Sequence, residues 1–170
     1  MNILVIGAGG VGASIASIAE TRQFFSHCYI ADISLDRVKN AIEALDDPSR
    51  FSAKVVDARS TKDLVSLIGE TKADIIVNAC DPRLNEPIFR AAFESGISYM
   101  DMAMNLSTPH PDNPYEEVGK ELGHDQIAED ELWREKGILA LIGMGVEPGL
   151  SDVFARYASD HLFDTIDEIG

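Results

Sequence analysis

The first twelve residues constrain the fold of this chain more than any other segment. An apolar run, MNILVI at residues 1–6, leads directly into GAGGVG at residues 7–12, after which a helical pattern begins. A strand, a Gly-x-Gly-x-x-Gly turn and a helix in this order form the dinucleotide-binding fingerprint. In it, Gly7 permits a sharp turn, Gly9 lets the backbone approach a pyrophosphate, and Gly12 lets the helix pack close to the sheet. The segment therefore predicts a phosphate site at a helix N-terminus, where free N–H groups and the helix dipole favour anions.

A second apolar run ends in a carboxylate at the position that meets the adenosine ribose in such folds. Residues 28–31 are followed by Asp32, which lies 20 positions after Gly12. A carboxylate there accepts hydrogen bonds from both ribose hydroxyls and repels a 2′-phosphate, so Asp32 favours NAD over NADP. Arg37 lies nearby and is of the type that meets a phosphate. The alternative role for Asp32 is to turn the chain before the next helix, although Ser34 already offers a helix cap.

Size and charge exclude several classes of function. A length of 170 residues with 45% apolar residues fits one domain, or one domain with a piece of a second. The formal net charge of −15 argues against binding to nucleic acids or to anionic membrane surfaces. The two cysteines, Cys28 and Cys80, lie in or at the end of apolar runs and are expected to be core thiols. Because the N-terminus lacks a basic region and its apolar run is short, we expect a cytoplasmic protein.

Strand-like and helix-like segments alternate along the chain, which predicts a parallel sheet with crossover helices. The expected strands are residues 3–6, 28–31, 53–56, 74–78, 98–101 and 138–142. The expected helices are residues 11–20, a helix capped by Ser34, a helix opened by Ser60 with Asp63, and residues 87–95, 125–136 and 151–163. Six strands with intervening helices predict a complete doubly wound α/β (Rossmann) domain with strand order 3-2-1-4-5-6.

Two regions depart from this alternation. Residues 103–124 are polar and irregular and contain three prolines, which is typical of a functional loop such as a lid. At the other end, the amphipathic helix at 151–163 is followed by a strand-like start at 165–169. We therefore expect a dinucleotide-binding domain over residues 1–147. Residues 148–170 would then be a connecting helix and the first strand of a second domain that is otherwise absent.

Further cofactor-binding candidates lie at the carboxyl ends of the expected strands, where ligands bind in such folds. Asp57 and Ala58 follow the third strand, and Asn78 and Ala79 follow the fourth. Asp57 either contacts the adenine edge or forms a turn. The Asn78 amide either bonds to the ribose on the nicotinamide side or fixes its own loop.

Candidates for catalysis are fewer. Asp101 ends the fifth strand and is a candidate acid or base, with the orientation of a loop as its alternative role. Glu147 lies among glycines and a proline after the sixth strand and is a similar candidate. Since no His or Cys pair has the spacing of metal ligands, we predict no metal site.

Four segments together resemble the saccharopine dehydrogenase family. They are GAGGVG at 7–12, VNACDP at 77–82, YMDMA at 99–103 and GMGVEPGLSD at 143–152. The resemblance implies a nicotinamide-binding domain followed by a substrate and dimerisation domain, and hence a homodimer. It also implies hydride transfer between an amino-acid-derived amine and its imine. The positions that match the family's cofactor residues are Gly7, Gly9, Gly10, Val11, Gly12 and Asp32.

The expected function is therefore that of the cofactor domain of an NAD-dependent oxidoreductase with a small amine or amino-acid substrate. Some family members carry Ser and Arg after the second strand and take NADP, and Asp32 departs from that pattern. An alternative is a non-catalytic module that senses NAD(H), because no residue here is a compelling catalyst. A methyltransferase is a more distant alternative, disfavoured by the glycine spacing and by the six-strand pattern.

Overall fold

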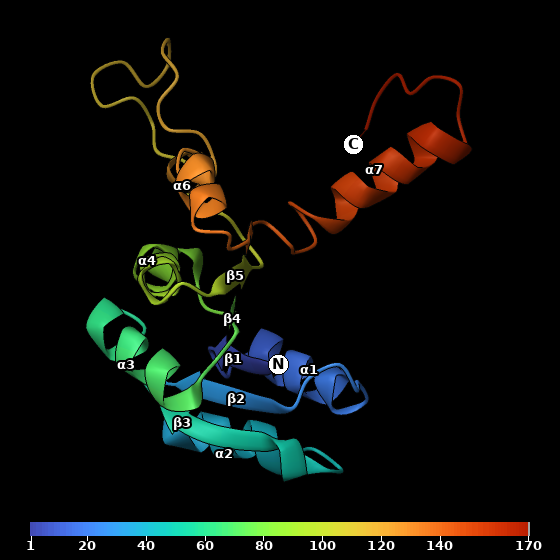
Figure 1. Ribbon diagram of the computed structural model, residues 1–170. Coiled ribbons are helices and arrows are strands. Elements are labelled where there is room, and N and C mark those ends of the chain that lie inside the picture. The colour runs from blue at the N-terminus through green and yellow to red at the C-terminus, as the bar shows by residue number, and fades with distance from the viewer. Residues whose placement is uncertain (170) are drawn as a thin grey trace.

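Six parallel strands form a single sheet in residues 1–169, the part of the chain that this computed structural model describes (Figure 1). The strands are β1 (Asn2–Ile6), β2 (His27–Asp32), β3 (Phe51–Val55), β4 (Ile75–Asn78), β5 (Ser98–Asp101) and β6 (Ala140–Leu141). Their order, β3-β2-β1-β4-β5-β6, confirms the predicted doubly wound α/β fold. Because the direction of winding reverses between β1 and β4, a crevice is expected beyond the carboxyl ends of these strands.

Helices connect the strands. They are α1 (Gly10–Glu20), α2 (Leu35–Glu43), α3 (Thr61–Thr71), α4 (Asn85–Ser95), α5 (His124–Ile127), α6 (Asp130–Glu135) and α7 (Leu150–His161), with short 3-10 helices η1 (Pro48–Arg50) and η2 (Pro82–Leu84). Two predicted caps are confirmed. The Ser34 hydroxyl accepts the Arg37 N–H at the start of α2, and the Ser60 hydroxyl accepts the Asp63 N–H at the start of α3.

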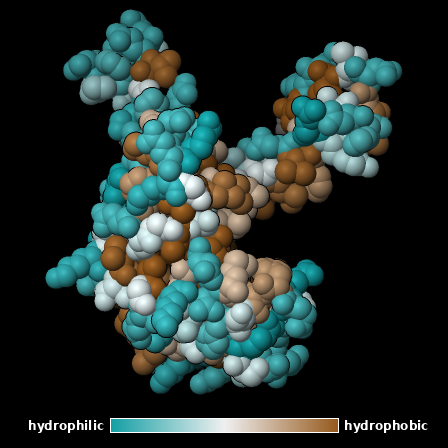
Figure 2. All heavy atoms as spheres, viewed as in Figure 1, coloured by the Kyte–Doolittle hydropathy of each residue, from teal (hydrophilic) through white to brown (hydrophobic). Residues whose placement is uncertain are grey.

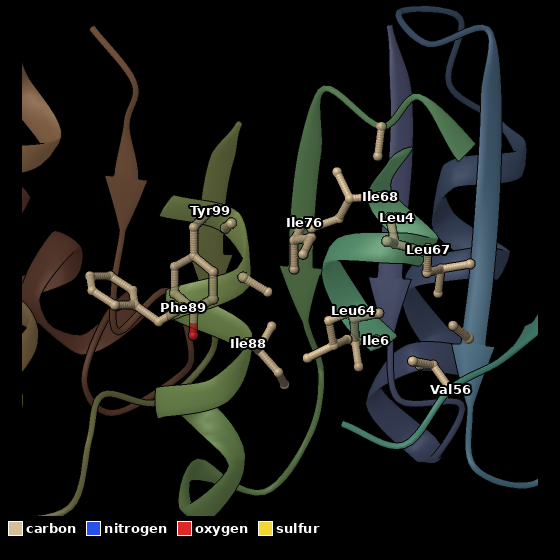
Figure 3. Close-up of a cluster of buried hydrophobic side chains, with 14 of the residues drawn as sticks. Leu4, Ile6, Val56, Leu64, Leu67, Ile68, Ile76, Ile88, Phe89 and Tyr99 are labelled. Carbon is tan, nitrogen blue, oxygen red and sulfur yellow. The ribbon is translucent and has the colours of Figure 1, made fainter. Parts of the chain in front are cut away.

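Two apolar cores lie on opposite faces of the sheet. Side chains alternate between the faces along a strand, so Ile3 and Val5 of β1 join the core under α1 and α2. Leu4 and Ile6 of the same strand join the core under α3 and α4 (Figure 3). The core under α3 and α4 ends in a group of aromatic side chains from α4, β5 and α6. In it, the Phe89 and Tyr99 rings meet edge to face with their centroids 5.1 Å apart. This aromatic group packs beside β5, whose last residue is Asp101.

The helix predicted over residues 125–136 is wrong in its continuity, because the structure divides it into α5 and α6. At the break, the Glu129 N–H bonds to the Gln126 carbonyl, three residues back instead of four. The Gln126 side chain is drawn inward to donate to Asp101, and the Glu129 carboxylate binds Arg90 from α4 at 2.6 Å. Tertiary contacts of these side chains thus override the helical periodicity of the sequence.

Two segments project from the body of the domain (Figure 1). The first joins β5 to α5, and paired backbone hydrogen bonds of 2.9 Å between Thr108 and Lys120 close its base. The second is α7, which buries none of its residues and leaves Phe154 63% exposed; its apolar atoms are visible on the upper-right arm in Figure 2. No helix within residues 1–169 combines the length and apolar character needed to cross a membrane.

The structure gives residues 165–169 no regular secondary structure, and the strand expected there as part of a second domain stays a prediction. A strand needs a neighbour to receive its backbone hydrogen bonds, and none of the strands in residues 1–169 lies beside this segment. The final position of the expected second-domain segment, residue 170, lies outside the described residues.

Candidate functional site

The glycine turn between β1 and α1 has the geometry that its sequence predicts. Gly7 has a φ of +103°, a conformation that other residues rarely adopt, and a Cβ there would lie 2.8 Å from the Ala79 carbonyl oxygen. At Gly12, a Cβ would overlap the carbonyl oxygen of Gly7. Both glycines are therefore required for the close packing of α1 against the strand ends.

The other two glycines of the turn face open space. A Cβ built at Gly9 or at Gly10 would meet nothing within 4 Å. Gly9 is the N-cap of α1, and no side chain in residues 1–169 caps this helix. The first N–H groups of α1 are therefore left for an anion, at the positive end of the helix dipole. This cradle fits a pyrophosphate.

Asp32 lies beside this turn with its side chain 10% exposed. Its Oδ2 accepts the Ala8 N–H and its Oδ1 accepts the Ser34 N–H, both at 2.9 Å. The carboxylate thus turns the chain before α2, which was the alternative role, while Ser34 still caps that helix. Each oxygen retains capacity for a further hydrogen bond, so the turn role and a contact to ribose hydroxyls are compatible.

A cleft of about 320 Å³ extends from the glycine turn over the ends of β2, β3 and β4. Its lining includes the predicted site residues Gly7, Gly9, Asp32, Asp57, Ala58 and Ala79. The cleft also brings in two arginines, Arg37 and Arg59, in a chain whose net charge is strongly negative. Three carboxylates, those of Asp32, Asp57 and Asp81, line the same cleft, and Asp57 is paired with Arg59, so the lining as a whole is not cationic.

The Asp57 carboxylate at the rim of the cleft is bound to its own neighbour. It accepts hydrogen bonds from the Arg59 N–H and from the Arg59 guanidinium, at 2.7 Å for the shortest pair of atoms. The guanidinium hydrogen bond lowers the pKa of Asp57 to about 2. Of the two predicted roles, the structure shows the turn-forming one; the adenine contact stays a prediction.

Asn78 does not line the cleft, which leaves the predicted contact between its amide and the cofactor ribose without support. The side chain is 1% exposed, and its Nδ2 donates to Asn85 Oδ1 at 2.8 Å and to the Tyr99 hydroxyl at 3.1 Å. Its Oδ1 accepts the Cys80 N–H. With its hydrogen bonds directed to the protein, Asn78 fixes its loop, which was the alternative role.

Asp101 is equally buried, which fits its alternative role of orienting a loop and leaves its role as an acid or base without support. It is 1% exposed, and it accepts hydrogen bonds from Gly143 N at 2.7 Å, Gln126 Nε2 at 2.7 Å and the Tyr99 hydroxyl at 3.0 Å. Burial raises the pKa of Asp101, and these three hydrogen bonds oppose that shift. Glu147, in contrast, is exposed in the loop between β6 and α7, and its catalytic role stays a prediction.

The sequence reasoning missed the buried side chains that bond to Asp101 and Asn78. Gln126, Asn85 and Tyr99 are buried polar or phenolic side chains from α5, α4 and β5. No spacing in the sequence connects Gln126 with Asp101, 25 positions apart.

The cysteines are free; burial raises the pKa of Cys28 to about 12 and that of Cys80 to about 11. In residues 1–169, no group of three or more His, Cys, Asp or Glu side chains is arranged to hold a metal ion.

A family model described as the NADP-binding domain of saccharopine dehydrogenase matches residues 3–141. The match runs from β1 to the end of β6 and so includes the glycine turn and the cleft. The chain belongs to the saccharopine dehydrogenase family. Membership confirms the resemblance expected from the sequence motifs, and it assigns a dinucleotide-binding role to the domain.

Two relatives are similar along nearly the whole chain. Carboxynorspermidine synthase of Vibrio cholerae is 33% identical over 178 residues, covering 99% of this chain and 42% of that protein. Carboxyaminopropylagmatine dehydrogenase of a Synechocystis species is 28% identical over 164 residues, covering 96% of this chain and 39% of that protein. The chain therefore spans about two-fifths of the length of these curated relatives.

A solved structure shows the same fold. Saccharopine dehydrogenase (L-Glu forming) of Saccharomyces cerevisiae superposes with a TM-score of 0.69 at 14% identity, covering 95% of this chain and 31% of that protein. The doubly wound architecture of this saccharopine dehydrogenase family member is thus shared despite low sequence identity.

Proposed function

We propose that this chain is the cofactor-binding part of an NAD-dependent oxidoreductase. Its reaction would be hydride transfer at the amine- or imine-bearing carbon of an amino-acid-derived substrate. The relatives support this substrate class, because they are named carboxynorspermidine synthase and carboxyaminopropylagmatine dehydrogenase, and both names denote carboxylated amines. When bound, the nicotinamide supplies or accepts the hydride.

The observation that carries the proposal is the start of α1. The helix has no side-chain cap within residues 1–169, and the space beside Gly9 and Gly10 is open. Side chains of Ser34 and Ser60 cap α2 and α3, whereas α4, α5 and α6 begin without a side-chain cap as α1 does, so the open space beside Gly9 and Gly10 is what distinguishes the start of α1. An uncapped helix start in an open cradle, with a ribose-reaching carboxylate beside it, fits a dinucleotide.

Asp32 supports NAD as the cofactor. A 2′-phosphate near this carboxylate would meet a like charge, whereas free ribose hydroxyls would find an acceptor. Arg37 acts against this effect, since its guanidinium lies 4.0 Å from Asp32 Oδ1, but its side chain is 66% exposed and more strongly screened by solvent than the 10% exposed carboxylate. The family model is named for NADP, so the proposed preference for NAD rests on Asp32 alone.

The residues of this chain would therefore contribute mainly by positioning. The N–H groups at the start of α1 bind the pyrophosphate, and Asp32 fixes the adenosine ribose. The loops at 103–124 and 143–149 form one wall at the reacting end and exclude water from it. Holding two reactants in productive geometry can supply much of a rate enhancement without an acid–base residue in this domain.

Calorimetric titration of the chain with NAD and NADP tests the proposal. We expect NAD to bind more tightly than NADP. Tighter binding of NADP would overturn the role given to Asp32, and binding of neither would overturn the whole proposal. The hydride-transfer step of the proposal is tested with the longest protein whose sequence includes this chain. NAD binding without any amine-dependent change in NADH absorbance would favour a sensing module instead.

A further inference from the structure

A single hydrogen-bonded network connects the buried polar side chains beneath the strand ends. Among the buried polar or charged side chains of residues 1–169, all except Thr71 belong to it: Asn78, Asn85, Asp101 and Gln126. The Tyr99 hydroxyl joins them, accepting from Asn78 at 3.1 Å and donating to Asp101 at 3.0 Å. The Tyr99 ring itself remains in the apolar core beside Phe89 (Figure 3). Burying so many polar groups together is costly unless every group is bonded, so the network specifies one arrangement.

The network has one end at the dinucleotide cleft. Asn78 Oδ1 accepts the N–H of Cys80 at 3.0 Å, and Cys80 lines the cleft together with Ala79 and Asp81. Asn85 extends the network sideways, because its Nδ2 donates to the carbonyl of Ala103 at 2.6 Å. The turn after β4 and the chain leaving β5 are therefore held by the same set of side chains.

The other end of the network is the loop between β6 and α7, residues 143–149. Asp101 Oδ1 accepts the N–H of Gly143 at 2.7 Å, and the Asp101 carbonyl accepts the N–H of Met144 at 2.9 Å. Close packing adds to these bonds, since a Cβ at Gly145 would overlap the Met102 carbonyl oxygen. The loop is thereby seated directly on the end of β5.

A carboxylate is the one side chain that suits position 101. Its oxygens accept three donors, the Gly143 N–H, the Gln126 amide and the Tyr99 hydroxyl. An ionised carboxyl group is acceptor-only, whereas an amide would present two N–H groups to some of these donors. Gln126 is oriented in turn, because its Oε1 accepts the N–H of Asn105 at 2.8 Å.

This loop lies where the second half of a dinucleotide would extend. The cleft with Asp32 and Asp57 covers the ends of β2 and β3 on one side of the switch point and reaches the turn after β4 on the other. A dinucleotide bound across the switch point would place its nicotinamide half on the other side, toward the ends of β4, β5 and β6. Those are the strand ends that the network joins.

We propose that Asp101 is a positioning residue, which sets the Gly143–Gly149 loop against the nicotinamide half of the bound cofactor through the network that also holds the turn after β4. This inference rests on the proposed function. It differs from a catalytic role, because Asp101 acts through Gly143 and Gln126 and never meets substrate. If Asp101 has this role, a substitution at Asp101 should weaken the binding of the nicotinamide half of the cofactor and leave the binding of the adenosine half unchanged.

The test compares two ligands of the 170-residue chain, NADH and ADP-ribose, by calorimetry. ADP-ribose carries the adenosine and pyrophosphate half and lacks the nicotinamide. For Asp101→Asn, we expect NADH to bind about tenfold more weakly and ADP-ribose to change by less than about twofold, as one buried donor loses its acceptor. Energy transfer from Trp133, the sole tryptophan of the chain, to bound NADH provides a spectroscopic check.

A rescue variant separates positioning from general damage. In the double variant Asp101→Asn with Gln126→Glu, the amide and the carboxylate exchange places. The new amide at position 101 then donates to the new carboxylate at position 126 and still accepts from Gly143, while the Tyr99 hydroxyl loses the Oδ2 to which it donates. We expect this variant to recover part of the NADH affinity that Asp101→Asn loses. Asp130→Asn, which removes an exposed carboxylate from α6, is the matched control and should leave both affinities unchanged.

The outcomes are distinguishable. Equal weakening of both ligands in folded Asp101→Asn, or no change in either, overturns the positioning role. If Asp101→Asn does not fold, as judged by circular dichroism, Gln126→Leu replaces it and is held to the same criterion. If the unmodified chain binds neither ligand, the proposed function fails and this inference fails with it.

Discussion

The backbone N–H of Ala8 donates a hydrogen bond of 2.9 Å to Oδ2 of Asp32, which joins the glycine turn to the end of β2. The same carboxylate holds the start of the next connection through the Ser34 N–H. Asp32, which is expected to select the cofactor, therefore also supports the glycine turn that is expected to bind the phosphates of the cofactor. Changes at Asp32 should consequently alter both stability and ligand preference.

Replacement of Asp32 by Asn should reduce both properties. An amide oxygen can serve one of the two backbone donors well, so we expect a loss of about 1–2 kcal/mol in the free energy of unfolding. NAD should bind about tenfold more weakly, while the discrimination against NADP should shrink because the like-charge repulsion is gone. Urea unfolding and calorimetry measure the two effects.

Asp36→Asn is the matched control for this change. Asp36 lies in the first turn of α2, is exposed, and does not line the cleft. It alters the net charge by the same amount, so it should leave NAD and NADP discrimination intact. A similar loss of discrimination in both variants would mean that overall charge, and not the Asp32 carboxylate, selects the cofactor.

Two glycines of the turn should respond to alanine in opposite ways. In Gly12→Ala the new methyl group would overlap the Gly7 carbonyl oxygen, so α1 must shift and stability should fall by about 1–3 kcal/mol. In Gly9→Ala the methyl group would enter open space, so stability should stay within about 0.5 kcal/mol. That methyl group would instead block the pyrophosphate cradle, and NAD binding should be lost. If Gly9→Ala still binds NAD normally, the phosphates lie elsewhere.

These contrasts show what could be predicted from the sequence. The strand order follows from the alternation of apolar strand-like and helix-like segments, which can be read from short stretches of sequence. The turn glycines follow in the same way, because the positive φ at Gly7 is a local requirement of the turn. The burial of Asn78 and the binding of Gln126 to Asp101 could not be predicted, since they depend on where distant elements meet. The break between α5 and α6 belongs with them, because it follows from inward contacts of Gln126 and Glu129.

Asp101 gives the chain a distinctive pH dependence. Burial raises the pKa of Asp101 above that of the unfolded chain, which is about 4. Between these two pKa values the folded state holds more protons, so the contribution of Asp101 to stability is greatest below about pH 4 and falls as the pH rises. The free energy of unfolding of the unmodified chain minus that of Asp101→Asn, measured in urea, should therefore decrease with rising pH. An increase over the same interval would contradict the burial effect.

Phenylalanines in the core and on α7 should differ sharply in importance. Phe89 is 4% exposed and packs on Tyr99 and Trp133, so Phe89→Ala should cost about 3–5 kcal/mol in the free energy of unfolding. Phe154 on α7 is 63% exposed, so Phe154→Ala should change stability by less than about 0.5 kcal/mol. A large loss from Phe154→Ala would show that α7 packs against the domain in solution.

The binding of NAD and NADP to the chain at equal ionic strength tests the central claim most directly. We predict saturable binding of NAD, weaker binding of NADP, and the loss of NAD binding in Gly9→Ala, whose fold should be intact. An NAD affinity that Gly9→Ala leaves unchanged, or an absence of binding by the unmodified chain, would contradict the assignment of the α1 start as a dinucleotide site.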